Sequence, residues 1–119
     1  MNKKVLIVDD DNDILEPLAI LLQEEGYDVQ TTSKGTQTFT KVESYKPDLI
    51  LLDILMSGSD GRNICKKLKR TKATKHIPIV MMSAHPGSDK DSISCGADTF
   101  IAKPFEADDL LALLRNTLQ

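Results

Sequence analysis

Acidic, hydroxyl and lysine side chains stand where short apolar stretches of this sequence end. These polar residues are Asp9, Asp10, Asp53, Ser83 and Lys103. Three carboxylates that meet at one place repel each other unless a cation binds between them, and Mg²⁺ is a hard cation that prefers oxygen ligands. With a hydroxyl donor and a lysine, the set supplies the nucleophile, the metal ligands and the positive charge for phosphoryl transfer onto a carboxylate.

The apolar stretches alternate with helix-like segments along the whole chain. Their composition predicts strands over residues 4–8, 27–32, 48–52, 77–82 and 100–102. Apolar residues at helical spacing predict helices over residues 14–22, 35–44 and 110–118, another after Gly61 and a weak one over 86–95. Strands and helices in this order predict an α/β fold, with a parallel sheet covered by helices on both faces.

The position of the strand ends turns this fold prediction into a site prediction. Residues 48–52 are apolar on both faces of a strand, so they are expected at the centre of the sheet. In open parallel sheets, ligands bind beyond the carboxyl ends of the strands. A single aspartate after a strand is often only a turn former or a helix N-cap, and Asp11 or Asp13 suits that role. The whole set occurring together favours a site.

Composition and length narrow the class of protein. A chain of 119 residues fits one domain, residues 1–119, and the net charge of −3 gives no support to nucleic-acid binding. No signal-peptide core occurs, and no apolar run approaches the roughly 20 residues of a membrane span. Cys65 and Cys95 lack the spacing of a zinc or redox motif, and we expect them to be part-buried thiols. We therefore expect a cytoplasmic protein without a membrane partner.

The chain resembles the receiver domain of two-component response regulators over essentially its whole length. The motifs that carry the resemblance are residues 5–10, 49–53, 60–61, 82–84, 96–98 and 103–105. Each motif is weak alone, but their order and spacing together are specific. The resemblance implies a flavodoxin-like, five-stranded parallel sheet in the order 2-1-3-4-5, and it implies a phosphoacceptor switch rather than an enzyme.

The resemblance also implies a role for each acidic residue. Asp53 would accept the phosphoryl group from the phosphohistidine of a sensor histidine kinase or a histidine phosphotransfer protein. Asp10, Asp53 and the backbone carbonyl of Leu55 would bind Mg²⁺ directly, and Asp9 would act mainly through a bound water.

The remaining motif residues would transmit the signal. Ser83 would hydrogen-bond a phosphoryl oxygen, and Lys103 would pair with the phosphorylated aspartate, its peptide bond to Pro104 being cis. Phe100 would be the switch aromatic, although simple core packing is the competing interpretation. The output would pass to a downstream effector protein or domain, or through a dimer that forms on phosphorylation.

Three features of the sequence affect what the resemblance implies for this chain. Ser57 stands where proline is usual, which predicts a more flexible loop after Asp53. Leu55 is apolar and cannot position a water, so we expect slow self-dephosphorylation, whereas His85 is expected to contact solvent or phosphate. Residues 86–95 are poor helix formers, which predicts a short or mobile helix on the output surface.

A basic stretch lies near the predicted end of the third helix. Its residues are Lys66, Lys67, Lys69, Arg70, Lys72 and Lys75. Cations are favourable at a helix C-terminus, and solvated faces are commonly charged, so this stretch can be an ordinary surface. A patch that binds a partner is the alternative.

Three other functions fit parts of the pattern. A phosphohydrolase of the haloacid-dehalogenase type would use Asp9 or Asp10 as nucleophile, but its Asp-x-Asp-Gly-Thr pattern is missing. A flavin or dinucleotide binder would need Gly, Ser or Thr after the first strand, where three aspartates would repel phosphate. An interaction module that no longer uses phosphorylation remains a third possibility, which a phosphorylation assay would decide.

Overall fold

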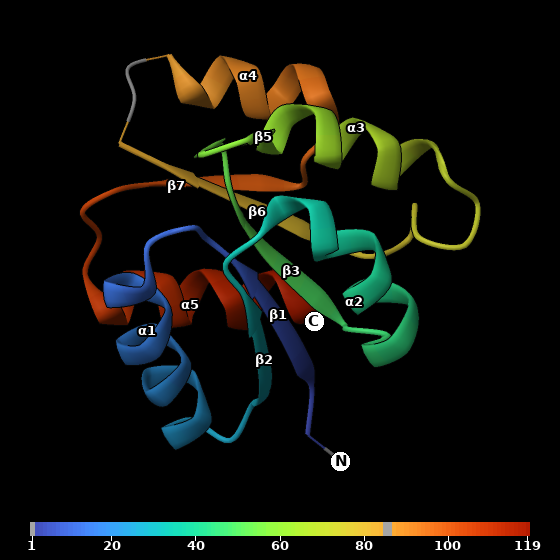
Figure 1. Ribbon diagram of the computed structural model, residues 1–119. Coiled ribbons are helices and arrows are strands. Elements are labelled where there is room, and N and C mark those ends of the chain that lie inside the picture. Colours follow the sequence, from blue (N-terminus) through green and yellow to red (C-terminus); the bar gives the residue numbers. More distant parts are fainter. Residues whose placement is uncertain (1, 85–86) are drawn as a thin grey trace.

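A parallel sheet of five strands forms the centre of the molecule (Figure 1). The structure is a computed structural model that describes residues 2–84 and 87–119. The strands are β1 (Lys4–Val8), β2 (Asp28–Thr32), β3 (Leu49–Asp53), β6 (Ile79–Ser83) and β7 (Thr99–Ala102). Their spatial order is β2-β1-β3-β6-β7, which confirms the predicted order 2-1-3-4-5 when these strands are counted along the chain.

Strand β3 is the most enclosed part of the sheet. All five of its residues are buried, and it pairs with β1 on one side and β6 on the other. A strand buried on both faces cannot alternate polar and apolar residues, which is why its sequence reads as a continuous apolar run. The prediction of a central strand ending at Asp53 is confirmed.

Helices cover both faces of the sheet and bury alternate residues of its strands. Helices α1 (Asn12–Glu24) and α5 (Ala107–Leu118) pack over one face, on residues such as Ile7 and Leu51. On the other face, α2 (Thr38–Tyr45), α3 (Gly61–Arg70) and α4 (Ser88–Cys95) lie over a core that includes Leu52 and Met81. The alternation follows from the two-residue period of a strand, whose side chains point to opposite faces in turn.

Some predicted boundaries differ from the observed ones. The predicted helix over 35–44 is a 3₁₀ turn, η1 (Gly35–Gln37), followed by α2. The segment predicted as a loop after Asp53 contains a small antiparallel hairpin, β4 (Leu55–Met56) and β5 (Ser59–Asp60). Helix α4 has eight residues, as expected of a short helix. The expectation for His85 lies outside the described residues.

The two cysteines are more buried than the sequence suggested. Cys65 is fully buried, Cys95 is 3% exposed, and both are free thiols. They lie at the contact between α3 and α4, where the Cys65 thiol is 3.5 Å from the Cys95 carbonyl oxygen. Burial raises the pKa of the Cys65 thiol well above its ordinary value, so this thiol is unreactive.

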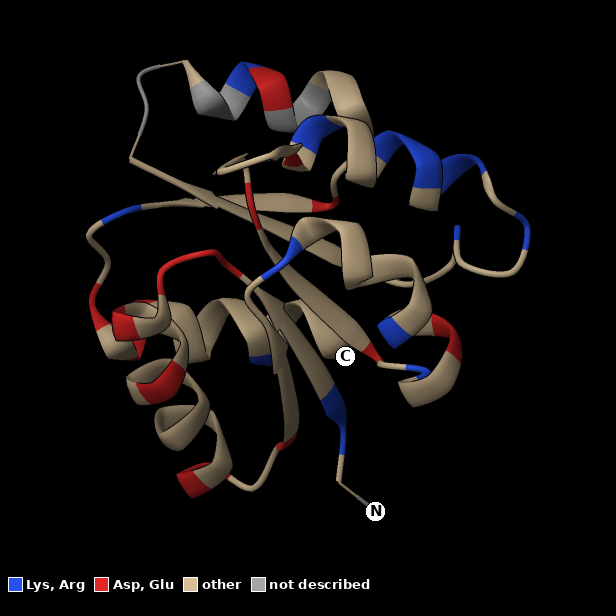
Figure 2. Cartoon of the chain, viewed as in Figure 1, with Lys and Arg blue, Asp and Glu red and all other residues tan. Residues whose placement is uncertain are grey.

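Charge is unevenly distributed over the surface. No Asp or Glu occurs from Gly61 to Ser88, a stretch with seven of the fifteen Lys and Arg residues, so it carries +7 and the other residues −10. Figure 2 shows the basic residues along α3 and the loop after it. The helix ends at Arg70, so Lys67, Lys69 and Arg70 lie in its last turn, where cations are favourable, and Lys72 and Lys75 lie beyond it. Across the described residues, no helix is long and apolar enough to cross a membrane.

Gly61 lets the start of α3 approach the end of β3. A Cβ at this position would lie 2.2 Å from the backbone oxygen of Asp53 and 2.9 Å from the Cα of Ile54. We predict that Gly61→Ala lowers the free energy of unfolding by about 3 kcal/mol, because backbone atoms must move apart. Urea unfolding measures this loss. Gly26→Ala is the control, with nothing within 4 Å of its Cβ at a φ of 95°, and should cost only about 1 kcal/mol. Equal losses would contradict the prediction.

Candidate functional site

Three carboxylates meet at the carboxyl edge of the sheet. Strands β1 and β3 are neighbours, with Val8 opposite Leu52, so the acids that follow in the two strands lie side by side. One carboxylate oxygen from each of Asp9, Asp10 and Asp53 lies within 4.8 Å of the others. Asp9 is 1% exposed and Asp53 6%, so little water screens their repulsion. The predicted meeting of these acids is confirmed.

Lys103 supplies the positive charge of the cluster. Its Nζ lies 2.6 Å from Oδ2 of Asp9 and 3.6 Å from Oδ1 of Asp53. The backbone N–H of Lys103 donates to the carbonyl of Ser83 at 3.0 Å, which continues the pairing of β7 with β6 beyond the strand end. The sequence placed Lys103 at this edge but did not predict that Asp9 would be its nearer partner. The peptide bond from Lys103 to Pro104 is cis, as expected.

Asp10 joins the cluster to the hairpin that follows Asp53. The backbone N–H of Ser57 donates to Oδ2 of Asp10 at 2.7 Å. Since Ser57 lies in the turn between β4 and β5, this hydrogen bond holds the turn against the acidic side of the site. Sequence reasoning treated Ser57 only as a missing proline, because a backbone donor leaves no signal in residue type.

The first acid after β1 also shapes the start of α1. Asp9 accepts a hydrogen bond from the backbone N–H of Asp11 at 3.0 Å. Asp11 is the N-cap of α1, and its side chain accepts from the backbone N–H of Asp13 at 2.9 Å. The capping role considered for Asp11 is therefore confirmed, and Asp9 and Asp10 remain directed to the cluster.

The surroundings of Asp53 raise the pKa of its carboxyl group. Burial, the main cause, raises its pKa to about 6, and the charges of Asp9 and Asp10 act in the same direction. Lys103 and a hydrogen bond from the backbone of Leu55 oppose this shift in pKa. Near pH 7 the carboxylate is therefore mostly ionised but held in an unfavourable environment, which favours binding of a cation or bond formation at its oxygen.

The donor set fits a hard divalent cation. With all groups ionised, the three carboxylates and Lys103 leave a charge of −2, which one Mg²⁺ would balance. Oxygen ligands from carboxylates are those that Mg²⁺ uses in proteins. Asp9, Asp10 and Asp53 would hold the ion. The Leu55 side chain beside them is 49% exposed, and the role of its carbonyl as a ligand stays a prediction.

The two predicted signalling residues lie in adjacent strands. Ser83 ends β6 and is 3% exposed, one position beyond Met82, which pairs with Asp53. Phe100 lies in β7 opposite Met81 and packs, half-buried, against the core beneath α2, α3 and α4. The structure thus brings Ser83 to the edge that carries the acids. Phe100 belongs to the face on which α4 lies, and its role as a switch stays a prediction.

Comparison with known proteins gives one consistent family. Residues 5–115 match the sequence model described as the response regulator receiver domain. The DNA-binding response regulator MtrA of Mycobacterium tuberculosis is 37% identical over 121 residues, covering all of this chain and 52% of MtrA. The chain therefore spans about half the length of the curated relatives it matches.

Solved structures show the same fold. A putative response regulator of Chloroflexus aurantiacus aligns with a TM-score of 0.94 and 31% identity, covering 99% of this chain and 98% of that one. The chemotaxis protein CheY4 of Vibrio cholerae aligns with a TM-score of 0.92 and 29% identity, covering 99% of this chain and all of that one. The flavodoxin-like fold class is confirmed.

The raised pKa of Asp53 predicts how the stability of the metal-free protein depends on pH. A carboxyl group with a pKa of about 6 when folded and 3.8 when unfolded destabilises the fold as pH rises between these values. Asp53→Asn removes this ionisation and leaves Lys103 paired with Asp9. We predict that, at pH 7 without divalent cations, the variant is more stable than the parent by about 2 kcal/mol.

Denaturant unfolding of both proteins between pH 4 and pH 7 tests this prediction. The difference in unfolding free energy should be small at pH 4, grow up to pH 6 and then level off. Added Mg²⁺ should reduce it by stabilising the parent protein. A variant that is no more stable than the parent at pH 7 would contradict the prediction.

Proposed function

The chain belongs to the response regulator receiver domains of two-component signal transduction, and on that premise we propose that Asp53 is its phosphoacceptor. Receiver domains are phosphoacceptor switches. The observation that carries the assignment is the position of Asp53 at the end of the central strand, in the acidic cluster and 3.6 Å from Nζ of Lys103. Asp9 and Asp10 follow β1 rather than the central strand β3, and Asp9 is already paired with Lys103.

The proposed reaction begins with the ionised form of Asp53. One carboxylate oxygen attacks the phosphorus of a phosphohistidine, and the bond between phosphorus and the imidazole nitrogen breaks. The electron pair of that bond stays with the imidazole, which leaves as a neutral ring when its other nitrogen carries a proton. The product is an acyl phosphate on Asp53. A pKa of about 6 keeps the nucleophile ionised at neutral pH.

Charge neutralisation is the proposed contribution of the neighbouring residues. Asp10, Asp53 and the Leu55 carbonyl would hold Mg²⁺ directly, with Asp9 acting through water. When bound, Mg²⁺ neutralises charge on the phosphoryl oxygens. Lys103, with Nζ between Asp9 and Asp53, can pair with the added phosphoryl group without leaving the cluster.

The proposed output runs from Ser83 to the surface that contains α4. Ser83 would donate to a phosphoryl oxygen, and the half-buried Phe100 would follow its movement as the switch aromatic. The proposed chemistry is self-phosphorylation and self-dephosphorylation, with no separate substrate turned over. Residues 1–119 would act as one receiver domain.

The proposed partners follow from this chemistry. A sensor histidine kinase or a histidine phosphotransfer protein would supply the phosphoryl group, and an effector protein or domain would receive the signal. MtrA is described as DNA-binding, but this chain covers only 52% of it, so no contact with nucleic acid is assigned to the chain. We place the protein in the cytoplasm, where kinases have ATP and buried thiols stay reduced.

Phosphorylation of the purified chain tests the assignment. We predict that acetyl phosphate and Mg²⁺ add the mass of one phosphoryl group, because Asp53 is an activated carboxylate beside a metal site. Mass spectrometry should find the group on Asp53. Asp53→Asn should abolish it, and removal of Mg²⁺ with EDTA should abolish it as well.

Asp109→Asn is the matched control for this assay. Asp109 is an exposed acid in the first turn of α5, so the same change there should leave phosphorylation intact. If Asp53 stays unmodified in the parent protein, the chain is an interaction module without phosphorylation instead.

Leu55 predicts a long-lived phosphorylated state. Its exposed apolar side chain offers no hydrogen bond to an attacking water, so the acyl phosphate should last minutes rather than seconds. Leu55→Asn should shorten the half-life by about tenfold, because an amide can orient water. Loss of phosphate from the isolated domain measures this effect. Ile20→Asn changes another large exposed apolar residue, 48% exposed on α1, and should leave the half-life unchanged. A half-life of seconds in the parent would refute the idea.

A further inference from the structure

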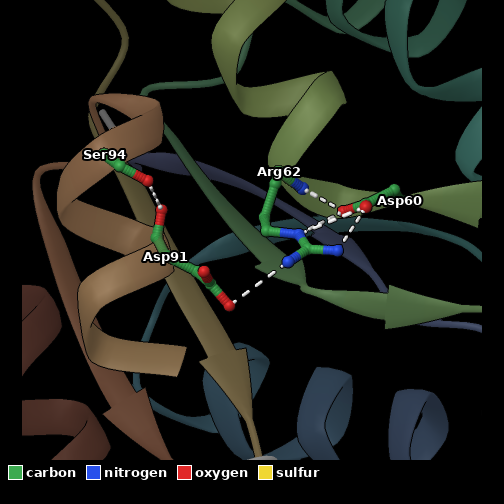
Figure 3. Close-up of polar contacts among 4 residues, drawn as sticks. All are labelled: Asp60, Arg62, Asp91 and Ser94. Atoms are coloured by element: carbon green, nitrogen blue, oxygen red, sulfur yellow. Dashed lines mark hydrogen bonds and ion pairs between the residues drawn. The ribbon is translucent and has the colours of Figure 1, made fainter. Parts of the chain in front are cut away.

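Arg62 connects two parts of the molecule that the sequence keeps apart. Its guanidinium contacts two carboxylates, Asp60 in β5 and Asp91 in α4 (Figure 3). Nε donates to Oδ1 of Asp60 at 2.9 Å and Nη2 donates to Oδ2 at 2.6 Å, which is a two-point contact. Nη1 reaches Oδ2 of Asp91 at 3.4 Å. Asp60 is the N-cap of α3, two residues before Arg62, whereas the contact with Asp91 depends on the tertiary structure, which is why sequence reasoning did not single out Arg62.

The Asp60 side of this contact leads back to the phosphoacceptor. Asp60 pairs with Leu55 across the β4–β5 hairpin, and the backbone N–H of Ser57, in the turn of this hairpin, donates to Oδ2 of Asp10 in the acidic cluster at 2.7 Å. The backbone N–H of Gly61 donates to the carbonyl of Ile54 at 2.8 Å, which closes the base of the hairpin. The hairpin is therefore attached to the acidic cluster through its turn, and its base lies directly after the residue that would be phosphorylated.

The Asp91 side leads into a helix with little intrinsic stability. Helix α4 has the sequence SDKDSISC, which contains three serines and two aspartates and no strong helix former except Lys90. Its buried end is Cys95, over Cys65 of α3. Asp91 is one turn earlier, and Ser94 donates to its carbonyl oxygen at 3.1 Å. The contact with Arg62 is thus a second attachment of α4 to α3.

The two contacts of Arg62 differ in strength. Bidentate bonds between arginine and a carboxylate at 2.6–2.9 Å are strong and geometrically specific. These bonds also lower the pKa of Asp60. The contact with Asp91, at 3.4 Å between side chains 39% and 33% exposed, is weak and solvated. Arg62 will therefore move with the hairpin, and a small movement will break its contact with α4.

We propose that Arg62 is a positioning residue that couples the state of Asp53 to α4, and that its contact with Asp91 belongs to the unphosphorylated form. This inference rests on the proposed function of Asp53. In this proposal, loading of Asp53 and binding of a cation by Asp10 change the contact between Asp10 and the Ser57 N–H, and the β4–β5 hairpin shifts in response. Asp60 and Arg62 shift with it, the contact with Asp91 is lost, and α4 is released from its second attachment.

Linkage gives this proposal a measurable consequence. A contact that exists only in the unloaded form opposes loading, and couplings between two sites are reciprocal. Removing the contact should therefore strengthen the binding of a phosphoryl mimic at Asp53. For one solvated ion pair, the expected gain in affinity is about two- to fivefold.

The test uses the whole chain, Mg²⁺ and beryllofluoride as the phosphoryl mimic. The variants are Asp91→Asn, Arg62→Lys and the double variant; lysine keeps the charge but cannot contact both carboxylates in a fork geometry. Each single variant should bind beryllofluoride about two- to fivefold more tightly, and the double variant no more tightly than either, because both remove one contact. Amide exchange in α4 should become faster on loading in the parent protein. The increase should be smaller in the variants, in which the contact with Arg62 is already missing.

Two controls separate coupling from general destabilisation. Glu43→Gln removes one negative charge from an exposed site on α2 and should bind beryllofluoride like the parent. In every variant, mass spectrometry measures whether acetyl phosphate phosphorylates Asp53. Unchanged or weaker beryllofluoride binding by Asp91→Asn and Arg62→Lys, with normal phosphorylation, overturns the coupling but not the proposed function. A parent protein that is never phosphorylated overturns the proposed function instead.

Discussion

Repulsion among three carboxylates is the interaction on which the rest of the structure depends. Asp9 and Asp53 are buried beside each other at the ends of neighbouring strands, and Asp10 adds a third negative charge. Lys103 offsets only part of this charge, from 2.6 Å to Asp9 and 3.6 Å to Asp53. The site therefore stays electrostatically unsatisfied, and a cation or a bond at an Asp53 oxygen relieves it. A binding site of this kind is unfavourable for the empty fold and useful for a switch.

The buried sheet is what makes such repulsion tolerable. Strand β3 lies between β1 and β6 and contributes only buried residues, so the backbone at Asp53 cannot move away from its neighbours. Gly61 shows how tightly the next element is packed, because a Cβ there would lie 2.2 Å from the Asp53 backbone oxygen. The hairpin after Asp53 is less enclosed, because none of its strand residues is buried.

Outside the site, charged residues are unevenly distributed along the chain. The stretch from Gly61 to Ser88 has a formal charge of +7 and the other residues −10, and the contacts differ along it. Lys69 pairs with Asp98, and Lys67 lies 4.3 Å from the centre of the Phe39 ring. Lys72 and Lys75, the two lysines of this stretch that follow Arg70, form no ion pair within the described part of the chain. In this stretch, two cations of α3 thus contact other parts of the domain, whereas Lys72 and Lys75 are exposed.

The sequence alone determined the α/β fold, the central strand and the acids, Ser83 and Lys103 at one edge, because apolar runs that end in polar residues are local signals. The boundaries of the elements were less certain. The hairpin at Leu55–Asp60 was predicted as a loop, because strands of two residues are too short to show an alternation of polar and apolar residues. Only the tertiary structure paired Lys103 with Asp9, Ser57 with Asp10 and Arg62 with Asp91. These contacts join residues 29 to 94 positions apart, and distance, burial and backbone donors are not encoded in residue type.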